Sequence, residues 1–171
     1  MAVWLVTGLA ATADAQAAEA DPVFGNQYWS ESDCAHPPPG PAIHVIVNGV
    51  KSNRGNVRLV LYDDKPNDFL VKGKRIARID LPARAGQMDI CLPLPHAGTY
   101  ALAVLHDQDA DGEYDLFKEG FGFSNNPRIL FSPPDYDEAS FTVEEGTLSL
   151  PVDLNYLLSP PGGRSRRPGG R

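Results

Sequence analysis

Short stretches in which apolar and polar residues alternate recur along the middle of this chain. The first four of them cover residues 43–48, 57–61, 77–81 and 88–92. A period of two is typical of strands that bury one face and expose the other. Turn signals such as Asn53-Arg-Gly55 separate the stretches. The pattern therefore predicts consecutive short strands.

Three further segments extend this series. Residues 99–105 are apolar at successive positions, which favours a strand that is covered on both faces or lies near a sheet centre. Residues 140–143 and 147–156 alternate again, and Pro151 lies on the polar face of the last segment. Because proline cannot donate a ladder hydrogen bond, we expect this strand at a sheet edge or with a bulge.

The chain is thus expected to be all-β, with about seven strands at roughly ten-residue spacing. No segment has a convincing amphipathic helical period, although residues 67–72 could form one helical turn. We predict an antiparallel β-sandwich of immunoglobulin-like or transthyretin-like type, with the strand order left open.

The ends of the chain differ from this middle region. Residues 1–20 have the apolar run and the small-x-small site of a secretory signal peptide, with cleavage expected between Ala15 and Asp21. The usual basic region before the run is absent, which suggests a start upstream of Met1. The expected organisation continues with a Pro-rich extension (21–41), the sandwich domain (42–157) and a disordered Arg/Gly/Pro tail (158–171). No stretch is long and apolar enough for a transmembrane helix, so we expect a periplasmic or secreted protein.

The two cysteines fit an oxidising compartment. In residues 88–92 the alternation turns Met88 and Ile90 toward the core, so Cys91 should face outward, where Cys34 in the extension can reach it. A bridge closing a loop of about 57 residues would add on the order of 4 kcal/mol in the chain-entropy model. We favour the Cys34–Cys91 bridge over two unpaired thiols.

Charge excludes one class of partner. The formal net charge is −7, and four arginines lie in the tail, so the rest of the chain is still more acidic. An acidic body argues against nucleic acid binding, which needs a basic surface. The tail could contact an anionic surface, but a solvated disordered segment is the favoured interpretation.

The densest run of charge is an acidic loop at residues 107–115. It contains five carboxylates around Gly112: Asp107, Asp109, Asp111, Glu113 and Asp115. Carboxylates so close repel one another, and a hard cation such as Ca²⁺ would relieve the repulsion. We therefore predict these five as metal ligands and Ca²⁺ as the cofactor.

The acidic loop matches only the first half of an EF-hand. Counting from Asp107, carboxylates fall at positions one, three, five and nine and glycine at six, but position twelve is Lys118 instead of glutamate. Glu119 or a distant residue would have to complete the shell, which favours weak binding. Asp and Gly are also ordinary turn residues, so a purely structural loop remains an equal alternative.

Two neighbouring features carry weaker signals. His106 adjoins Asp107 and could be a base or zinc ligand, although a satisfied histidine at a strand end is the favoured interpretation. Residues 120–126 alternate glycine with phenylalanine and end in two asparagines. Packing against the acidic loop is favoured over a sugar-binding or peptide-binding surface. That surface would contain His106, Tyr114, Phe121, Phe123, Asn125, Asn126 and Tyr136.

Several motifs together carry a family resemblance. These are Gly98-Thr-Tyr-Ala101, His106-Asp107 with the acidic loop, Glu119-Gly-Phe-Gly-Phe-Ser-Asn-Asn126, and the segment from Phe131 to Phe141. Residues 42–156 resemble the domain of unknown function 2141 family of exported bacterial proteins. The resemblance implies a secreted or periplasmic β-sandwich without an established activity or catalytic residues. The Cys34 extension and the arginine tail look like additions to the family core.

Three functional hypotheses follow. The first is a non-catalytic exported binding or structural module that is stabilised by a loop ion, with an unknown protein or glycan of the cell envelope as its partner. The second is a metal-assisted hydrolase that uses His106 and the loop carboxylates. The third is an adhesin-like module for glycan or protein. We assign no catalytic residue and favour the first.

Overall fold

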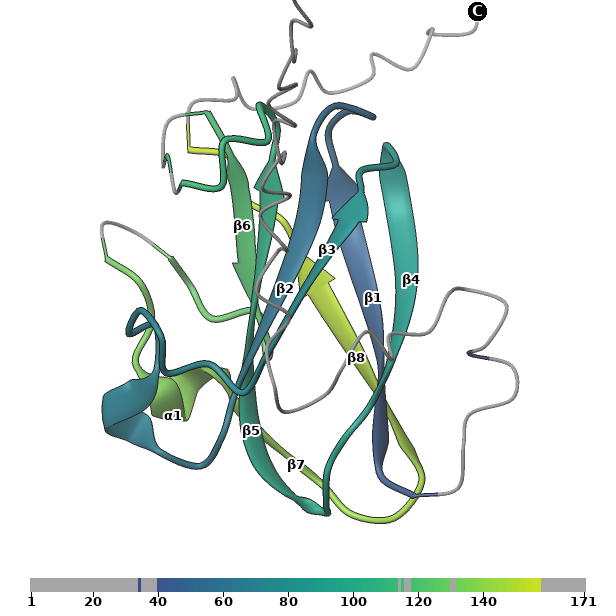
Figure 1. Cartoon of the computed structure of the whole chain (residues 1–171), viewed down its shortest axis with the longest axis vertical. Helices are drawn as coiled ribbons and strands as arrows, with labels where there is room; N and C mark the ends of the chain where they lie inside the picture. Colours follow the sequence, from purple (N-terminus) through teal and green to yellow (C-terminus); the bar gives the residue numbers. More distant parts are fainter. Residues whose placement is uncertain (1–33, 35–39, 114, 116–117, 130–131, 158–171) are drawn as a thin grey trace, which may run out of the picture.

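Two β-sheets face each other in the computed structural model, which describes residues 34, 40–113, 115, 118–129 and 132–157 (Figure 1). The predicted signal peptide and arginine tail lie outside these residues. The sandwich class is confirmed. Eight strands are present in the described part of the chain, one more than the alternation predicted.

The smaller sheet has the order β4-β1-β8. Its strands are β1 (Ala42–Val50), β4 (Gly86–Pro93) and β8 (Thr147–Asp153). The expected edge position of the strand with Pro151 is confirmed. The two sheets are mainly antiparallel, as predicted, and the pairing of β1 with β8 is parallel. The turn before β8 returns the chain beside the start of β1, where the Ala42 N–H donates to the Gly146 carbonyl at 2.9 Å.

The larger sheet has the order β3-β2-β5-β6, and β7 also pairs with β5. Its strands are β2 (Asn56–Tyr62), β3 (Ala77–Pro82), β5 (Gly98–Asp107), β6 (Gly120–Phe123) and β7 (Ser140–Val143). Ala101 pairs with Tyr62 on one side and Ser140 on the other. The predicted central position of β5 is thus confirmed.

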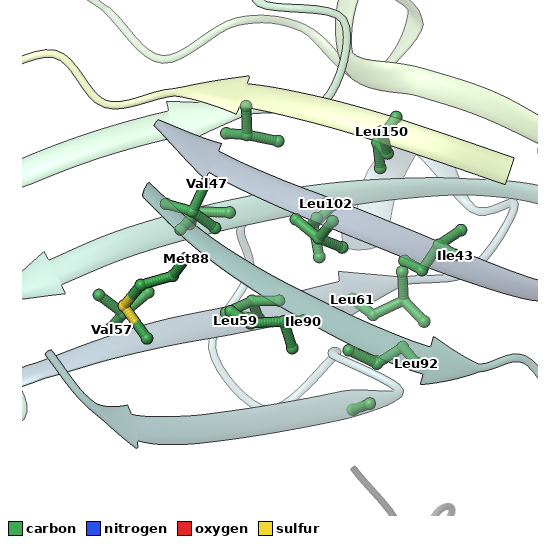
Figure 2. Close-up of a cluster of buried hydrophobic side chains, with 14 of the residues drawn as sticks. Ile43, Val47, Val57, Leu59, Leu61, Met88, Ile90, Leu92, Leu102 and Leu150 are labelled. Atoms are coloured by element: carbon green, nitrogen blue, oxygen red, sulfur yellow. The ribbon is translucent and has the colours of Figure 1, made fainter. Parts of the chain in front are cut away.

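The main core lies between the two sheets, as Figure 2 shows. The inward residues of the alternating stretches fill it, among them Ile43, Val47, Val57, Leu59, Leu61, Met88, Ile90, Leu92, Leu102 and Leu150. Each of these side chains is nearly inaccessible to solvent, which is the main source of stability for such a sandwich.

A second cluster covers the outer face of the larger sheet. Phe69 packs edge-to-face against Tyr62 and Tyr136, with ring centroids 5.3 and 5.9 Å apart. Phe121 and Phe123 belong to the same cluster, as do Tyr136 and Ala139 of the short helix α1 (Tyr136–Ala139), and Phe69 directly follows the short helix η1 (Pro66–Asp68). The cluster explains why β5 is apolar on both faces.

The disulfide between Cys34 and Cys91 is present, with the two Cα atoms 5.4 Å apart, and confirms the predicted pairing. Cys91 does not belong to the core between the sheets, yet only 2 % of it is exposed. It therefore lies on the outer face of β4. Within the described residues, no helix is long and apolar enough to cross a membrane.

Candidate metal centre in the acidic loop

The acidic loop begins where β5 ends, at Asp107, and leads toward β6. The turn that precedes the neighbouring strand β2 packs directly against the start of this loop. A Cβ atom on Gly55 would lie 1.8 Å from the Asp107 carbonyl oxygen, and Gly55 has φ +69°. Only glycine fits both the conformation and the space. The first residue of the loop is therefore held by close backbone packing.

Asp107 is completely buried, and its two oxygens have different surroundings. Oδ2 accepts hydrogen bonds from Arg58 Nη2 at 3.3 Å and from the Gly112 N–H at 3.1 Å. Oδ1 is buried and accepts no hydrogen bond from any described residue. A buried polar atom without a partner is costly and rare in folded proteins. Oδ1 is therefore available to a cation.

Glu119 is the second buried carboxylate of the loop, with 1 % of the residue exposed. Its Oε2 accepts the Asp115 N–H at 3.0 Å. Burial raises the pKa of Glu119 to about 7, the hydrogen bond from Asp115 opposes that rise, and the negative charges of Asp107, Asp109 and Asp111 add to it. The ionised form is thus unfavourable unless a positive charge is close.

Four carboxylates converge in this place. One oxygen from each of Asp107, Asp109, Asp111 and Glu119 lies within 4.8 Å of the others. Asp109 and Asp111 are exposed, whereas Asp107 and Glu119 are buried, so the cluster is half open to solvent. Oxygen ligands at this spacing suit a hard divalent cation, which takes such ligands at 2.3–2.6 Å in the case of Ca²⁺.

Two of the five predicted ligands lie apart from this cluster. Glu113 is exposed, and its N–H donates to Asp111 Oδ1 at 2.7 Å. Asp115 Oδ2 lies 3.3 Å from Lys118 Nζ, which is also 3.8 Å from Asp109 Oδ2. Glu119, one residue beyond the EF-hand position twelve, lies in the cluster in place of Glu113 and Asp115. Lys118 supplies a positive charge at the rim.

Arg58 is the residue of this site that sequence reasoning missed. Its Nη1 donates to the Gly112 carbonyl at 3.1 Å, and its Nε donates to Asp80 Oδ1 at 2.6 Å. Arg58 therefore connects the acidic loop to β3. Arg58 of β2 and Asp80 of β3 are directly paired. The pairing of these two strands would have been needed to find Arg58 from the sequence.

Asp80 completes this network on the outer face. Its Oδ2 accepts a hydrogen bond from Arg78 Nε at 2.6 Å. Burial alone would raise the pKa of Asp80, but the hydrogen bonds from Arg78 and Arg58 outweigh burial and lower it. Asp80 thus stays ionised and holds Arg58 toward Asp107.

His106 is fully buried, and both of its ring nitrogens have partners. Nδ1 lies 2.6 Å from the Tyr156 hydroxyl, and Nε2 lies 3.0 Å from the Arg54 carbonyl. Burial lowers the pKa of His106, while the Arg54 carbonyl and Asp107 act in the opposite direction. With both nitrogens engaged, the ring is a satisfied histidine at the end of a strand, the favoured interpretation.

Part of the predicted binding surface is packed inside the domain, whereas Asn125 and Asn126 are exposed and bonded to neighbouring backbone. Phe121 and Phe123 are 2 % and 4 % exposed and belong to the second cluster. Asn125 Nδ2 donates to the Ser140 carbonyl at 2.5 Å. Asn126 bonds β8 through the Pro151 carbonyl and the Asp153 N–H. Tyr114 lies outside the described residues.

Tyr136 and Ser124 are likewise structural. Tyr136 is 6 % exposed, and its hydroxyl donates to Asp64 Oδ1 at 3.3 Å. Ser124 is fully buried and bonds the backbone of Leu102 and Ala139. Residues 120–126 are thus packed in the fold, but these contacts are with β5, α1, β7 and β8 and not, as was expected, with the acidic loop.

The fold and the convergent carboxylates define a small β-sandwich domain with an acidic loop between β5 and β6. The chain belongs to the domain of unknown function 2141 family, described as an uncharacterised protein conserved in bacteria, whose model matches residues 45–150. The resemblance stated from the motifs is thereby confirmed. No curated protein and no solved structure matches the chain.

Proposed function

We propose that this protein is a non-catalytic, exported binding or structural module whose acidic loop binds Ca²⁺. The observation that carries the proposal is the convergence of four carboxylates, two of them buried, together with the buried Oδ1 of Asp107, which lacks a hydrogen-bond donor. A cation near Oδ1 would supply the missing partner and offset the repulsion among the acids.

Ca²⁺ fits this set better than Mg²⁺. The loop offers side-chain oxygens from two exposed and two buried positions, and Ca²⁺ accepts six to eight oxygens in variable geometry. Mg²⁺ demands near-ideal octahedral geometry and dehydrates reluctantly. Because Lys118 occupies position twelve, binding should be weak, with a Kd of about 10⁻⁴–10⁻³ M as in extracellular modules.

The role of the ion is to order the connection between β5 and β6. It would join the end of the central strand to Glu119, immediately before β6. Export is supported by the disulfide and by the signal-like sequence of residues 1–20. The proposed partner is a protein or glycan of the cell envelope.

Calorimetry tests the calcium proposal. The melting temperature is measured in EDTA and then in 10 mM Ca²⁺, for the wild type, Glu119→Gln and the control Glu144→Gln. Glu144 is an exposed acid outside the cluster, so its loss removes the same charge elsewhere. Saturation at about ten to a hundred times Kd stabilises by roughly 1.4–2.7 kcal/mol, which corresponds to a rise of about 4–10 °C.

We expect this rise in the wild type and the control, and not in Glu119→Gln. An unchanged melting temperature of the wild type at 10 mM Ca²⁺ would overturn the proposal. An equal rise in Glu119→Gln would place any bound ion elsewhere.

A further inference from the structure

A second set of metal-binding side chains lies on the outer face of the smaller sheet, away from the acidic loop. His44 of β1 and Cys91 of β4 are direct neighbours in the antiparallel pairing. Cys34 reaches the same place through its bond to Cys91. One ligand atom from each of the three lies within 4.8 Å of the others. Two thiols and an imidazole are a common part of zinc sites.

The ring of His44 is already held as a metal ligand would be. Its Nε2 lies 2.8 Å from Asp89 Oδ1, and Asp89 Oδ2 accepts Gln87 Nε2 at 3.0 Å. Metal-ligating histidines almost always donate their second ring N–H to a carboxylate or carbonyl, which fixes the tautomer and the orientation. The contact with Asp89 leaves Nδ1 as the nitrogen for a metal.

The backbone positions of these three residues also suit a metal site. His44 and Cys91 lie on paired strands, so their backbone positions are fixed by the sheet. Cys34 lies outside both sheets, so its sulfur can separate from that of Cys91 once the bond between them is broken. Two ligands on the sheet and the Cys34 thiolate supply three of the four tetrahedral positions around Zn²⁺, with water in the fourth.

We propose that reduction converts the Cys34–Cys91 bridge into a Zn²⁺ site completed by His44 and oriented by Asp89. A dithiol reductant transfers two electrons and two protons to the S–S bond, which gives two cysteine thiols, and the reductant leaves as its own disulfide. Zn²⁺ then displaces one proton from each thiol and binds the two thiolates and the imidazole. Either cross-link, covalent or metallic, tethers Cys34 to β4.

Cobalt spectroscopy tests this site directly. The full-length chain is reduced with a phosphine, desalted without oxygen and titrated with Co²⁺ in excess Ca²⁺, which occupies the acidic loop. Tetrahedral thiolate ligation gives intense visible bands and a thiolate-to-metal charge-transfer band. We expect these bands to saturate at one equivalent of Co²⁺ and to disappear when Zn²⁺ is added. The oxidised protein, with no thiolate to offer, should show none.

Variants connect the bands to the named residues. His44→Ala and Asp89→Asn should each weaken Co²⁺ binding by about tenfold or more, since ligands and their orienting partners contribute 10–100-fold to affinity. His96→Gln is the matched control, because His96 is an exposed histidine outside the cluster. Near-UV circular dichroism reports whether the reduced chain keeps its fold, with or without Zn²⁺.

Three results would overturn the proposal. The first is a reduced protein that absorbs no more than the oxidised one. The second is a His44→Ala variant with unchanged affinity. The third is a reduced chain that loses its native dichroism and does not regain it with Zn²⁺. Because the calcium test uses the oxidised protein and a melting temperature, each proposal can fail without the other.

Discussion

Arg58 and Asp107 form an ion pair inside the domain, with Nη2 3.3 Å from Oδ2 and side chains that are 10 % and 1 % exposed. Arg58 is a buried cation that the folded chain itself supplies to the acidic loop, in addition to the exposed Lys118. Removing one member of a buried pair leaves the other charge uncompensated, which typically costs about 3–5 kcal/mol. We expect Arg58→Gln to lower the free energy of unfolding by about 3 kcal/mol.

Urea unfolding in EDTA at pH 7 measures this loss. Arg78→Gln is the matched control, because Arg78 also bonds Asp80 but its side chain is 36 % exposed. An exposed ion pair contributes at most about 1 kcal/mol. Equal losses in the two variants would show that burial of Arg58 against Asp107 does not matter.

The buried carboxyl of Glu119 makes the stability of the metal-free protein depend on pH. Its pKa is about 7 in the folded protein against an ordinary value of 4.5, so the folded state binds the proton more tightly. The stability that this group contributes is therefore present below pH 4.5 and is lost as the pH rises through 7. Above pH 7 the folded protein carries the full penalty of a buried, crowded carboxylate.

Glu119→Gln removes that penalty. In EDTA at pH 8 the variant should be more stable than the wild type by on the order of 2–3 kcal/mol, and the difference should largely vanish at pH 5. Urea unfolding of both proteins at the two pH values measures it, with Glu144→Gln as the control. A stability difference that is the same at pH 5 and pH 8 would contradict the assignment of the raised pKa to Glu119.

Alternation in the sequence predicted the strands that bury one face, because each such strand shows its own period. It missed β6, where Gly120 and Gly122 stand at alternate positions. A Cβ at Gly122 would lie 2.6 Å from the Asp153 carbonyl, and one at Gly120 would lie 2.3 Å from the Tyr156 ring. These glycines let the end of β8 cross closely over β6, a tertiary contact that local propensity does not record.

Only those parts of the acidic site that are close together in the sequence could be predicted from it. The spacing of Asp107, Asp109 and Asp111 follows from the sequence, and they converge where the loop turns, at Ala110 with φ +58° and Gly112 with φ +80°. Arg58 joins them through the pairing of β2 with β5, which depends on strand order. The parallel pairing of β1 with β8 could not be predicted either, because it also depends on strand order.

Tyr156 satisfies the buried ring of His106, and its removal should be measurable. Tyr156→Phe deletes the hydroxyl that lies 2.6 Å from His106 Nδ1 and accepts the Lys51 N–H at 3.0 Å. Leaving a buried nitrogen without a partner costs about 1–3 kcal/mol. Urea unfolding should show this loss for Tyr156→Phe. Tyr62→Phe, at a tyrosine that belongs to the second cluster, should change stability by less than about 1 kcal/mol. The reverse order of losses would contradict the proposed role of Tyr156.

Gly55 lies in the turn that packs against Asp107, so adding a single methyl group there should strongly lower the free energy of unfolding. A Cβ would lie 1.8 Å from the Asp107 carbonyl oxygen, and the backbone has φ +69°. Gly73 has φ +81° but nothing within 4 Å of its would-be Cβ, so Gly73→Ala isolates the conformational penalty of about 1–3 kcal/mol. Gly55→Ala adds a backbone clash and should lose at least about 2 kcal/mol more.

Because that clash displaces the first carboxylate of the loop, Gly55→Ala should also lose the rise in melting temperature with Ca²⁺, whereas Gly73→Ala should keep it. Equal unfolding free energies for the two variants, or a full calcium response in Gly55→Ala, would show that the contact between Gly55 and Asp107 does not position the acidic loop.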